Sequence, residues 1–115
     1  MTNKHRLIIF YKQYFQDFFM EQNIKVQKKI LWTFDLIEEL PRVPEIYLKH
    51  IENTSGIYEI RVQNGNDIFR IFCFFNKDKC IILGNGFQKK TEKTPMNQIT
   101  LAQKIKLEYE KENKR

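Results

Sequence analysis

The chain has 115 residues, 42% of them hydrophobic, and a formal net charge of +6 near neutral pH. This length suits one domain spanning residues 1–115, with enough apolar residues for a core, and is too short for two independent cores. The apolar run at residues 7–10 is too short for a signal sequence or a transmembrane helix, so we expect a cytoplasmic protein without a membrane partner. The positive charge favours an anionic partner, such as nucleic acid or an acidic protein.

The first half of the chain predicts a short strand followed by two helices. Residues 7–11 form a β-type run, and aromatic residues at helical spacing predict a first helix at residues 14–19. Apolar residues recur at helical spacing over residues 24–40, which predicts a second helix. Pro41 ends this helix, because proline disfavours helical geometry in the residue before it. A short extended segment is expected at residues 47–51.

The second half predicts a sheet with tight turns. Residues 57–62 are typical of a strand, and residues 64–67 of a hairpin loop. The next strand, residues 68–75, is apolar on both faces, so we place it at the centre of the sheet. A turn at residues 76–79 then leads into a further strand at residues 80–83.

A final helix closes the predicted fold. Thr94 can cap this helix, Pro95 suits its first position, and the helix runs towards Tyr109. We therefore predict an α+β fold: an antiparallel sheet, mixed at its N-terminal strand, packs against two N-terminal helices and is joined by a C-terminal helix.

Three charged residues of the predicted sheet are candidates for phosphate chemistry. Glu59 and Arg61 share one strand face, and Arg70 interrupts an otherwise apolar central strand. Arginine suits phosphate because its planar fork can donate two parallel hydrogen bonds. A lone arginine in a strand usually pairs with a carboxylate, so Arg70 is expected to pair with Glu59. The same pair could also hold Arg70 in position for a scissile phosphate, and both interpretations stay open.

A basic segment, residues 86–95, is expected at the junction between the last strand and the last helix. Its ammonium groups, from Lys89, Lys90 and Lys93, could converge on phosphate together with backbone N–H groups. The alternative is a solvated basic loop. Phe87 lies beside these lysines and is a candidate for stacking on a nucleic-acid base.

Other reactive side chains indicate no further site. Cys73 and Cys80 lie in apolar runs, are expected to be free reduced thiols, and are too few for a zinc site. His5 and His50 have no recognisable partner, so we expect surface or structural roles for them. Trp32 in the long helix is expected in the core or at an interface. The sequence thus predicts neither a metal nor a cofactor.

Three blocks of sequence together resemble the phage-derived branch of the RelE/ParE toxin superfamily, whose members are called HigB-like or RelE-like toxins. The blocks are Gly56–Arg61, Phe69–Phe72 and Gly86–Pro95, and the resemblance extends from Phe10 to Tyr109. It implies a RelE-like fold and a type II toxin, meaning a small ribonuclease that cleaves mRNA on the ribosome. It also implies a helix-turn-helix antitoxin that neutralises this toxin.

The resemblance also assigns roles to particular residues. The family's basic cluster falls on Arg61, Arg70, Lys89, Lys90 and Lys93, with Glu59 at the matching strand position. Many relatives carry histidine where this chain has Asn85. An amide cannot act as an acid or base near neutral pH, so any role of that imidazole is lost here.

The leading hypothesis is a metal-independent endoribonuclease in which the 2′-OH of RNA attacks the adjacent phosphorus and leaves a 2′,3′-cyclic phosphate. Arg61 and Arg70 would bind the non-bridging oxygens, and one of the three lysines could transfer a proton. Glu59 would orient an arginine or serve as the base. Two alternatives remain: a non-enzymatic, ParE-like inhibitor of a protein target such as DNA gyrase, and a phage accessory RNA-binding module without catalysis.

Overall fold

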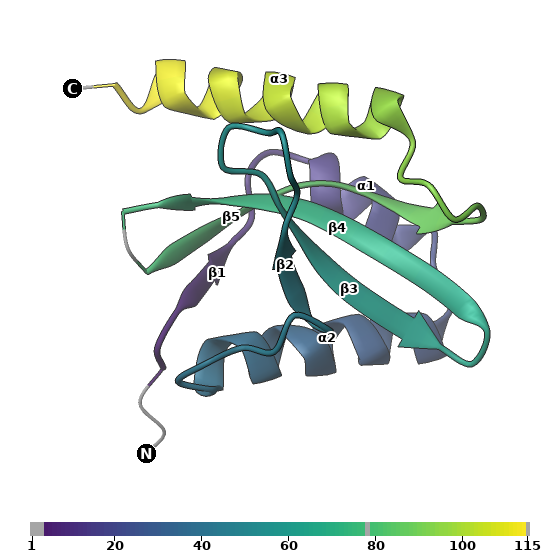
Figure 1. Cartoon of the computed structure of the whole chain (residues 1–115). Helices are drawn as coiled ribbons and strands as arrows, with labels where there is room; N and C mark the ends of the chain where they lie inside the picture. Colours follow the sequence, from purple (N-terminus) through teal and green to yellow (C-terminus); the bar gives the residue numbers. More distant parts are fainter. Residues whose placement is uncertain (1–3, 78, 115) are drawn as a thin grey trace.

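A five-stranded mixed sheet runs through the middle of the molecule, and three helices pack on it (Figure 1). This computed structural model describes residues 4–77 and 79–114, to which these counts refer. The strands lie in the order β1-β5-β4-β3-β2, with β1 parallel to β5 and the other neighbours antiparallel. Their bounds are Leu7–Ile9 (β1), Leu48–His50 (β2), Tyr58–Asn64 (β3), Asp67–Asn76 (β4) and Cys80–Lys89 (β5). The predicted α+β fold, with a sheet mixed at its N-terminal strand, is confirmed.

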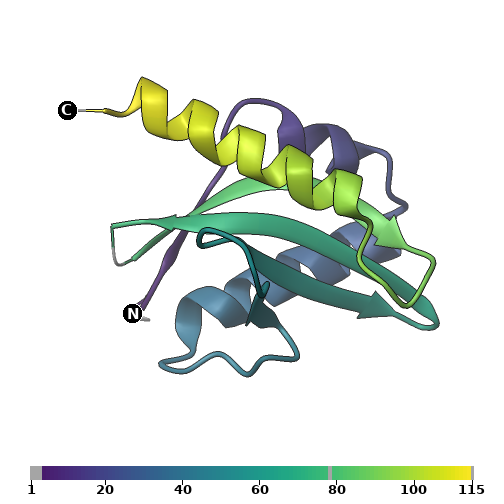
Figure 2. The same cartoon turned by 45° about the horizontal axis from the view of Figure 1, so that its top comes forward.

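The helices divide between the two faces of the sheet. α1 (Tyr14–Met20) and α2 (Ile24–Glu39) cover one face, whereas α3 (Met96–Glu112) crosses the other (Figures 1 and 2). Asn23 starts α2, because its side-chain oxygen accepts a hydrogen bond from the backbone N–H of Val26 at 2.9 Å. Both N-terminal helices match their predicted bounds to within a residue. Among the residues described, no helix combines the length and apolarity that crossing a membrane requires.

The start of α3 differs from the prediction. Pro95 occupies the N-cap position, and no side chain caps the helix, so the expected capping by Thr94 is wrong. Proline suits this place because it has no backbone N–H to leave unpaired. The helix therefore begins at Met96, one residue later than the sequence indicated.

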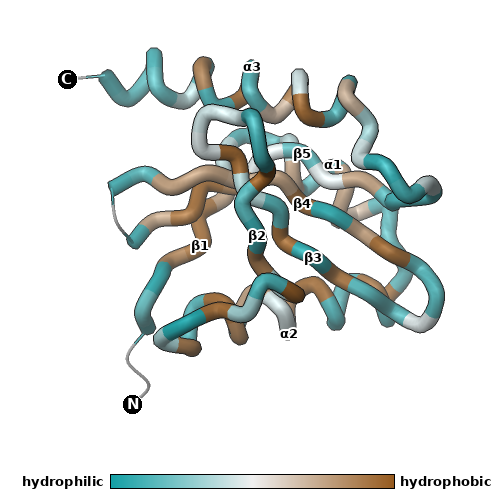
Figure 3. The backbone as a smooth tube through the Cα atoms, viewed as in Figure 1, coloured by the Kyte–Doolittle hydropathy of each residue, from teal (hydrophilic) through white to brown (hydrophobic). Residues whose placement is uncertain are grey.

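The core lies on both faces of β4. Ile71 and Cys73 belong to the cluster under α1 and α2, whereas Phe72 and Phe74 pack on the α3 side. This alternation follows from the two-residue period of a strand. Figure 3 shows brown, hydrophobic stretches along the central strands, while much of α3 is teal. The prediction that this strand is central is confirmed, since β4 is the third of the five.

β5 continues past Leu83, where the sequence placed its end. Gly84 and Asn85 both lie opposite Phe72, which makes a β-bulge with the extra residue in β5. The ladder with β4 then resumes, so residues 86–89 form strand rather than the predicted loop. The bulge depends on pairing with β4, and local sequence does not reveal it.

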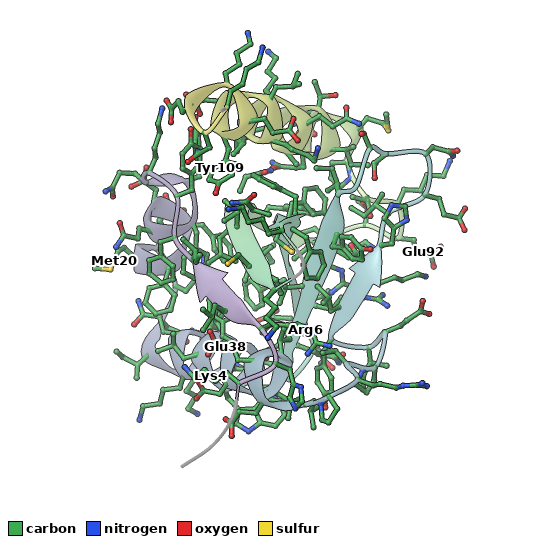
Figure 4. All side chains as sticks on the ribbon, turned by 90° about the vertical axis from the view of Figure 1, so that its left-hand side faces the viewer. Lys4, Arg6, Met20, Glu38, Glu92 and Tyr109 are labelled. Atoms are coloured by element: carbon green, nitrogen blue, oxygen red, sulfur yellow. The ribbon has the colours of Figure 1, made fainter. Side chains whose placement is uncertain are left out.

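The segment that contains β1 is hydrogen-bonded to the C-terminal end of α2. Lys4, Arg6 and Glu38, which lie at this contact, are labelled in Figure 4. Glu38 accepts a hydrogen bond from the backbone N–H of Ile8 at 2.8 Å. The guanidinium of Arg6 donates to the carbonyl of Leu40 at 2.7 Å. This arginine thus satisfies carbonyl groups that the helix leaves without partners at its C-terminus.

Candidate functional site

Three charged side chains share the sheet face that α3 crosses. Glu59 and Arg61 lie two residues apart on β3, so they point to the same face. Arg61 pairs with Arg70 on β4, and Arg70 pairs with Phe87 on β5. Because Phe87 packs with Ala102 of α3, this is the α3 side of the sheet. Glu59, Arg61 and Arg70 are called the arginine–glutamate cluster below.

The carboxylate of Glu59 lies between the two guanidinium groups. Its Oε2 is 3.6 Å from Nε of Arg61, and its Oε1 is 3.5 Å from Nε of Arg70. The expected ion pair between Glu59 and Arg70 is therefore present. Without this carboxylate, two like charges would face each other across the ladder, which is unfavourable. Two guanidinium groups and one carboxylate leave the cluster with net positive charge.

The cluster is mostly buried, with one more accessible member. Glu59 and Arg70 are 8% and 6% exposed, whereas the side chain of Arg61 is 30% exposed. Burial lowers the pKa of Arg70 and the nearby Arg61 lowers it further, while the Glu59 carboxylate opposes both effects. Arg70 nevertheless keeps its charge near neutral pH, because a guanidinium titrates far above that range.

Part of the hydrogen-bonding capacity of the cluster is unused. Nη1 of Arg70 donates to the carbonyl of Phe69 at 3.1 Å. Within residues 4–77 and 79–114, neither Nε of Arg70 nor Oε1 of Glu59 has a hydrogen-bond partner. These two atoms instead form the ion pair at 3.5 Å, which compensates their burial only in part. The guanidinium groups of the cluster bind anions most strongly, through charge-assisted hydrogen bonds.

A pocket of about 360 Å³ opens beside the two arginines. The pocket lies beyond the end of the β2–β3 ladder, because β2 pairs with β3 only from Tyr58 to Ile60. Its walls come from α2, the segment before β2, β3 and β4, and the lining residues are Lys29, Thr33, Ile46, Tyr47, Arg61, Val62, Gln63 and Arg70. The pocket gives a ligand access to the cluster from the edge of the sheet.

The structure divides the predicted lysine cluster. Lys89 ends β5 on the same face as Arg70, because it lies two residues beyond Phe87, which pairs with Arg70. Half-buried Lys89 and exposed Lys90 line a second hollow of about 600 Å³ near the turn between β3 and β4. Lys93 is exposed further along the loop and lines neither hollow.

Phe87, the candidate for stacking on a nucleic-acid base, is buried in the structure. Phe87 is 9% exposed, and its ring packs edge-on against Phe72 with centroids 5.3 Å apart. Ile57 and Ala102 complete this cluster. The reason is the continuation of β5 beyond the bulge, which turns Phe87 towards α3 instead of leaving it in a loop.

Asn85 connects β5 to the first turns of α3. Its amide nitrogen donates to the backbone oxygen of Gln98 at 3.1 Å and to the side-chain oxygen of Gln98 at 2.9 Å. The bulge turns Asn85 towards α3, and the residue is only 5% exposed. In this chain the position therefore fixes the end of the helix that borders the basic loop.

Several residues at the pocket were not identified from the sequence. Lys29 and Tyr47 come from distant segments: the packing of α2 beside β3 brings Lys29 to the pocket, and the carbonyl of Tyr47 accepts a hydrogen bond from the backbone N–H of Arg61 at 2.9 Å. Neither His5 nor His50 lines the pocket. Among the residues that the structure describes, no group of three or more His, Cys, Asp or Glu side chains could hold a metal ion.

Both cysteines are free thiols, as expected. Cys73 is buried on the opposite face from the arginine–glutamate cluster, and burial raises the pKa of its thiol. A thiol with a raised pKa is a poor nucleophile.

Comparison with known proteins places the chain in a family. The family model described as "Phage derived protein Gp49-like (DUF891)" matches residues 17–106, which is more than half of the chain. The chain belongs to this family, a family of toxins of toxin–antitoxin systems within the RelE/HigB-like superfamily. An antitoxin is therefore the partner that the family implies. No curated protein matches the chain significantly.

Proposed function

We propose that this Gp49-like toxin is a ribosome-dependent mRNA endoribonuclease that inhibits translation and needs no metal ion. The observation that carries the proposal is the arginine–glutamate cluster beside an open pocket. Two guanidinium groups held side by side by one carboxylate can bind two oxygens of a phosphate, and stabilising charge on phosphorus is the main task in this reaction.

The proposed reaction uses the 2′-OH of the RNA as the nucleophile. Its oxygen forms a bond to the adjacent phosphorus while the bond from phosphorus to the 5′-oxygen breaks. The 2′ proton passes to a base, and the leaving 5′-oxygen takes up a proton. The products are a 2′,3′-cyclic phosphate and a 5′-hydroxyl. Positioning the reacting atoms in line and stabilising the developing charge supply most of the rate enhancement.

The three members of the cluster have different roles in this proposal. Arg61, the more exposed arginine, contacts a non-bridging oxygen of the scissile phosphate. Arg70 lies deeper and stabilises the charge that develops in the transition state. Glu59 pairs with both guanidinium groups and so orients them. If Glu59 accepted a proton, both ion pairs would be lost, so we assign this carboxylate an orienting role rather than that of the base.

The lysines assist at the margin of the site. Lys89 lies on the same sheet face as Arg70, so we assign it protonation of the leaving oxygen. Lys90 and Lys93 are exposed and would hold the RNA backbone or ribosomal RNA through their charge. A helix-turn-helix antitoxin would neutralise the toxin by covering this basic face.

The test is cleavage of a short mRNA on programmed ribosomes, with excess EDTA and enough polyamine to keep the ribosomes assembled. A parallel substrate carries a single 2′-deoxy sugar at the cut site. We expect continued cleavage in EDTA, a 2′,3′-cyclic phosphate end, and resistance of the deoxy substrate. Cleavage of the deoxy substrate, or activity only with added divalent metal, contradicts the proposed chemistry. Intact mRNA together with loss of DNA supercoiling would instead identify a gyrase inhibitor.

A further inference from the structure

α2 carries a second basic surface outside the arginine–glutamate cluster. Lys25, Lys28 and Trp32 are exposed and Lys29 is half-buried. Their spacing of three, four and seven residues places them on one side of the helix. Together with Asn64, at the end of β3, they line a shallow hollow of about 400 Å³. These residues are called the α2 strip below.

The α2 strip continues into the pocket of the proposed active site. Lys29 lines both hollows, so it connects the strip to Arg61 and Arg70. The connection runs between α2 and β3, which lie side by side in Figure 1. No β2 residue pairs with β3 beyond Ile60, and the backbone N–H of Arg61 then donates to the carbonyl of Tyr47 at 2.9 Å. One basic path thus leads from the cluster to the N-terminal half of α2.

The lysines of the α2 strip carry charge that no described carboxylate neutralises. In the part of the chain that the structure describes, Lys25, Lys28 and Lys29 form no ion pair, whereas Lys12 and Lys106 do. Such free ammonium groups raise the affinity of a surface for phosphates.

The strip also has an exposed aromatic ring. Trp32 is 46% exposed, and the ammonium of Lys29 lies 4.6 Å from the centroid of its ring. The ring of Tyr47 packs edge-on at 5.9 Å and supports the indole from one side. An exposed aromatic ring among unpaired cations is the combination by which proteins bind single-stranded nucleic acid.

We propose that the α2 strip binds the single-stranded RNA that continues from the cleaved phosphate. The lysines contact successive phosphates, and Trp32 stacks on a base. This inference rests on the proposed ribonuclease function, because it treats the pocket as the place where the strand is cut. An acidic protein is the competing occupant. RNA is favoured because three lysines, without ion pairs among the described residues, surround the exposed indole in the strip.

The single tryptophan of the chain allows a direct test. A fully 2′-O-methylated single-stranded oligonucleotide, which this chemistry cannot cleave, is titrated into the full-length protein while Trp32 fluorescence is recorded. We expect saturable quenching from stacking on the indole. Lys25→Glu/Lys28→Glu should weaken the affinity at least roughly tenfold and lower the salt dependence of binding by about one to two counterions.

Lys104→Glu/Lys111→Glu is the matched control, since it changes the charge equally at exposed positions of α3. Equal weakening by both double variants, or binding without a change in Trp32 fluorescence, overturns the inference. So does an acidic partner that quenches Trp32 when the oligonucleotide does not. Arg70→Ala separates the two proposals, because it should reduce mRNA cleavage by about two to three orders of magnitude and leave the quenching intact. If the oligonucleotide quenches Trp32 and the quenching depends on Lys25 and Lys28, but the protein never cleaves mRNA, then RNA binding by the strip stands and only the proposed ribonuclease activity is refuted.

Discussion

At the scale of single residues, Arg70 joins structure and proposed function. It is a buried cation in a central strand, and its partner Glu59 is shared with Arg61. Burying the Arg70 charge away from water costs free energy. The ion pair with the shared Glu59 carboxylate, at 3.5 Å, offsets this cost only in part. A phosphate would supply the negative charge that this arrangement still lacks.

We expect Arg70→Ala to reduce mRNA cleavage by about two to three orders of magnitude while the protein stays folded, because Glu59 keeps its contact with Arg61. Arg70→Lys is the matched variant, which retains the charge but not the planar fork, so it should recover only part of the activity. Cleavage on programmed ribosomes and circular dichroism would be measured together. An unfolded Arg70→Ala protein whose soluble fraction cleaves normally would show a purely structural ion pair.

At the scale of elements, the position of β5 depends on close packing at its glycines. A Cβ added to Gly86 would lie 2.5 Å from the ring of Phe18 on α1. The same strand carries the bulge at Gly84 and Asn85, and Asn85 holds α3 through Gln98. β5 is therefore the element that aligns α1 and α3 on opposite faces around the site.

We expect Gly86→Ala to lower the free energy of unfolding by about 1–3 kcal/mol, because Phe18 must leave its rotamer or the strand must shift. Urea denaturation of the single variants and of Gly86→Ala/Phe18→Leu would measure the coupling between the two positions. The cost of the added methyl group should fall when the ring is replaced. An additive double variant would show that Phe18 is not the obstacle.

The C-terminal half of α3 is held by contacts to the segment before α1. The ammonium of Lys12 lies 2.8 Å from Glu108 and 2.9 Å from Glu112. Hydrogen bonds from Lys12 and Tyr14 lower the pKa of Glu108, and those from Lys12 and Tyr11 lower the pKa of Glu112. A carboxyl group whose pKa is lower in the folded than in the unfolded state stabilises the fold at pH values above its unfolded-state pKa. This stabilisation is lost as the pH falls through the folded-state pKa.

These contacts predict an acid-sensitive attachment of α3. Wild type should melt at a higher temperature than Glu108→Gln/Glu112→Gln near neutral pH, and the difference should shrink as pH falls below about 4. The control is Glu110→Gln, which removes only an exposed pair with Lys106 within the helix and should have a smaller effect. A difference in melting temperature that does not change with pH would rule out the ion pairs as its cause.

At the scale of the whole molecule, the fold follows largely from local patterns. Helical spacing located α2, two-residue alternation located β3 together with the shared face of Glu59 and Arg61, and a run that is apolar on both faces located β4. The hairpin between β3 and β4 then sets Arg61 opposite Arg70. These features need only short-range information, which the sequence contains.

The remaining features depend on contacts between distant segments. The bulge in β5 exists only in the ladder with β4, so its consequence, the burial of Phe87, could not be read from residues 86–95. The pocket beside Arg61 needs Lys29 from α2 and Tyr47 from before β2. Lysines on a helix are usually solvated, so nothing local distinguished Lys29 before the packing was known.

The charge of the whole molecule predicts how the antitoxin binds. A net charge of +6 attracts an acidic partner over long distances, so the association rate constant should fall roughly tenfold or more between low and physiological salt. Screening acts on the approach of the two proteins, so the dissociation rate constant should change much less. Stopped-flow or surface-based kinetics over a salt series would measure both constants. Association that is insensitive to salt would show that the antitoxin instead recognises apolar surface, such as exposed Met20 on α1 or Met96 on α3.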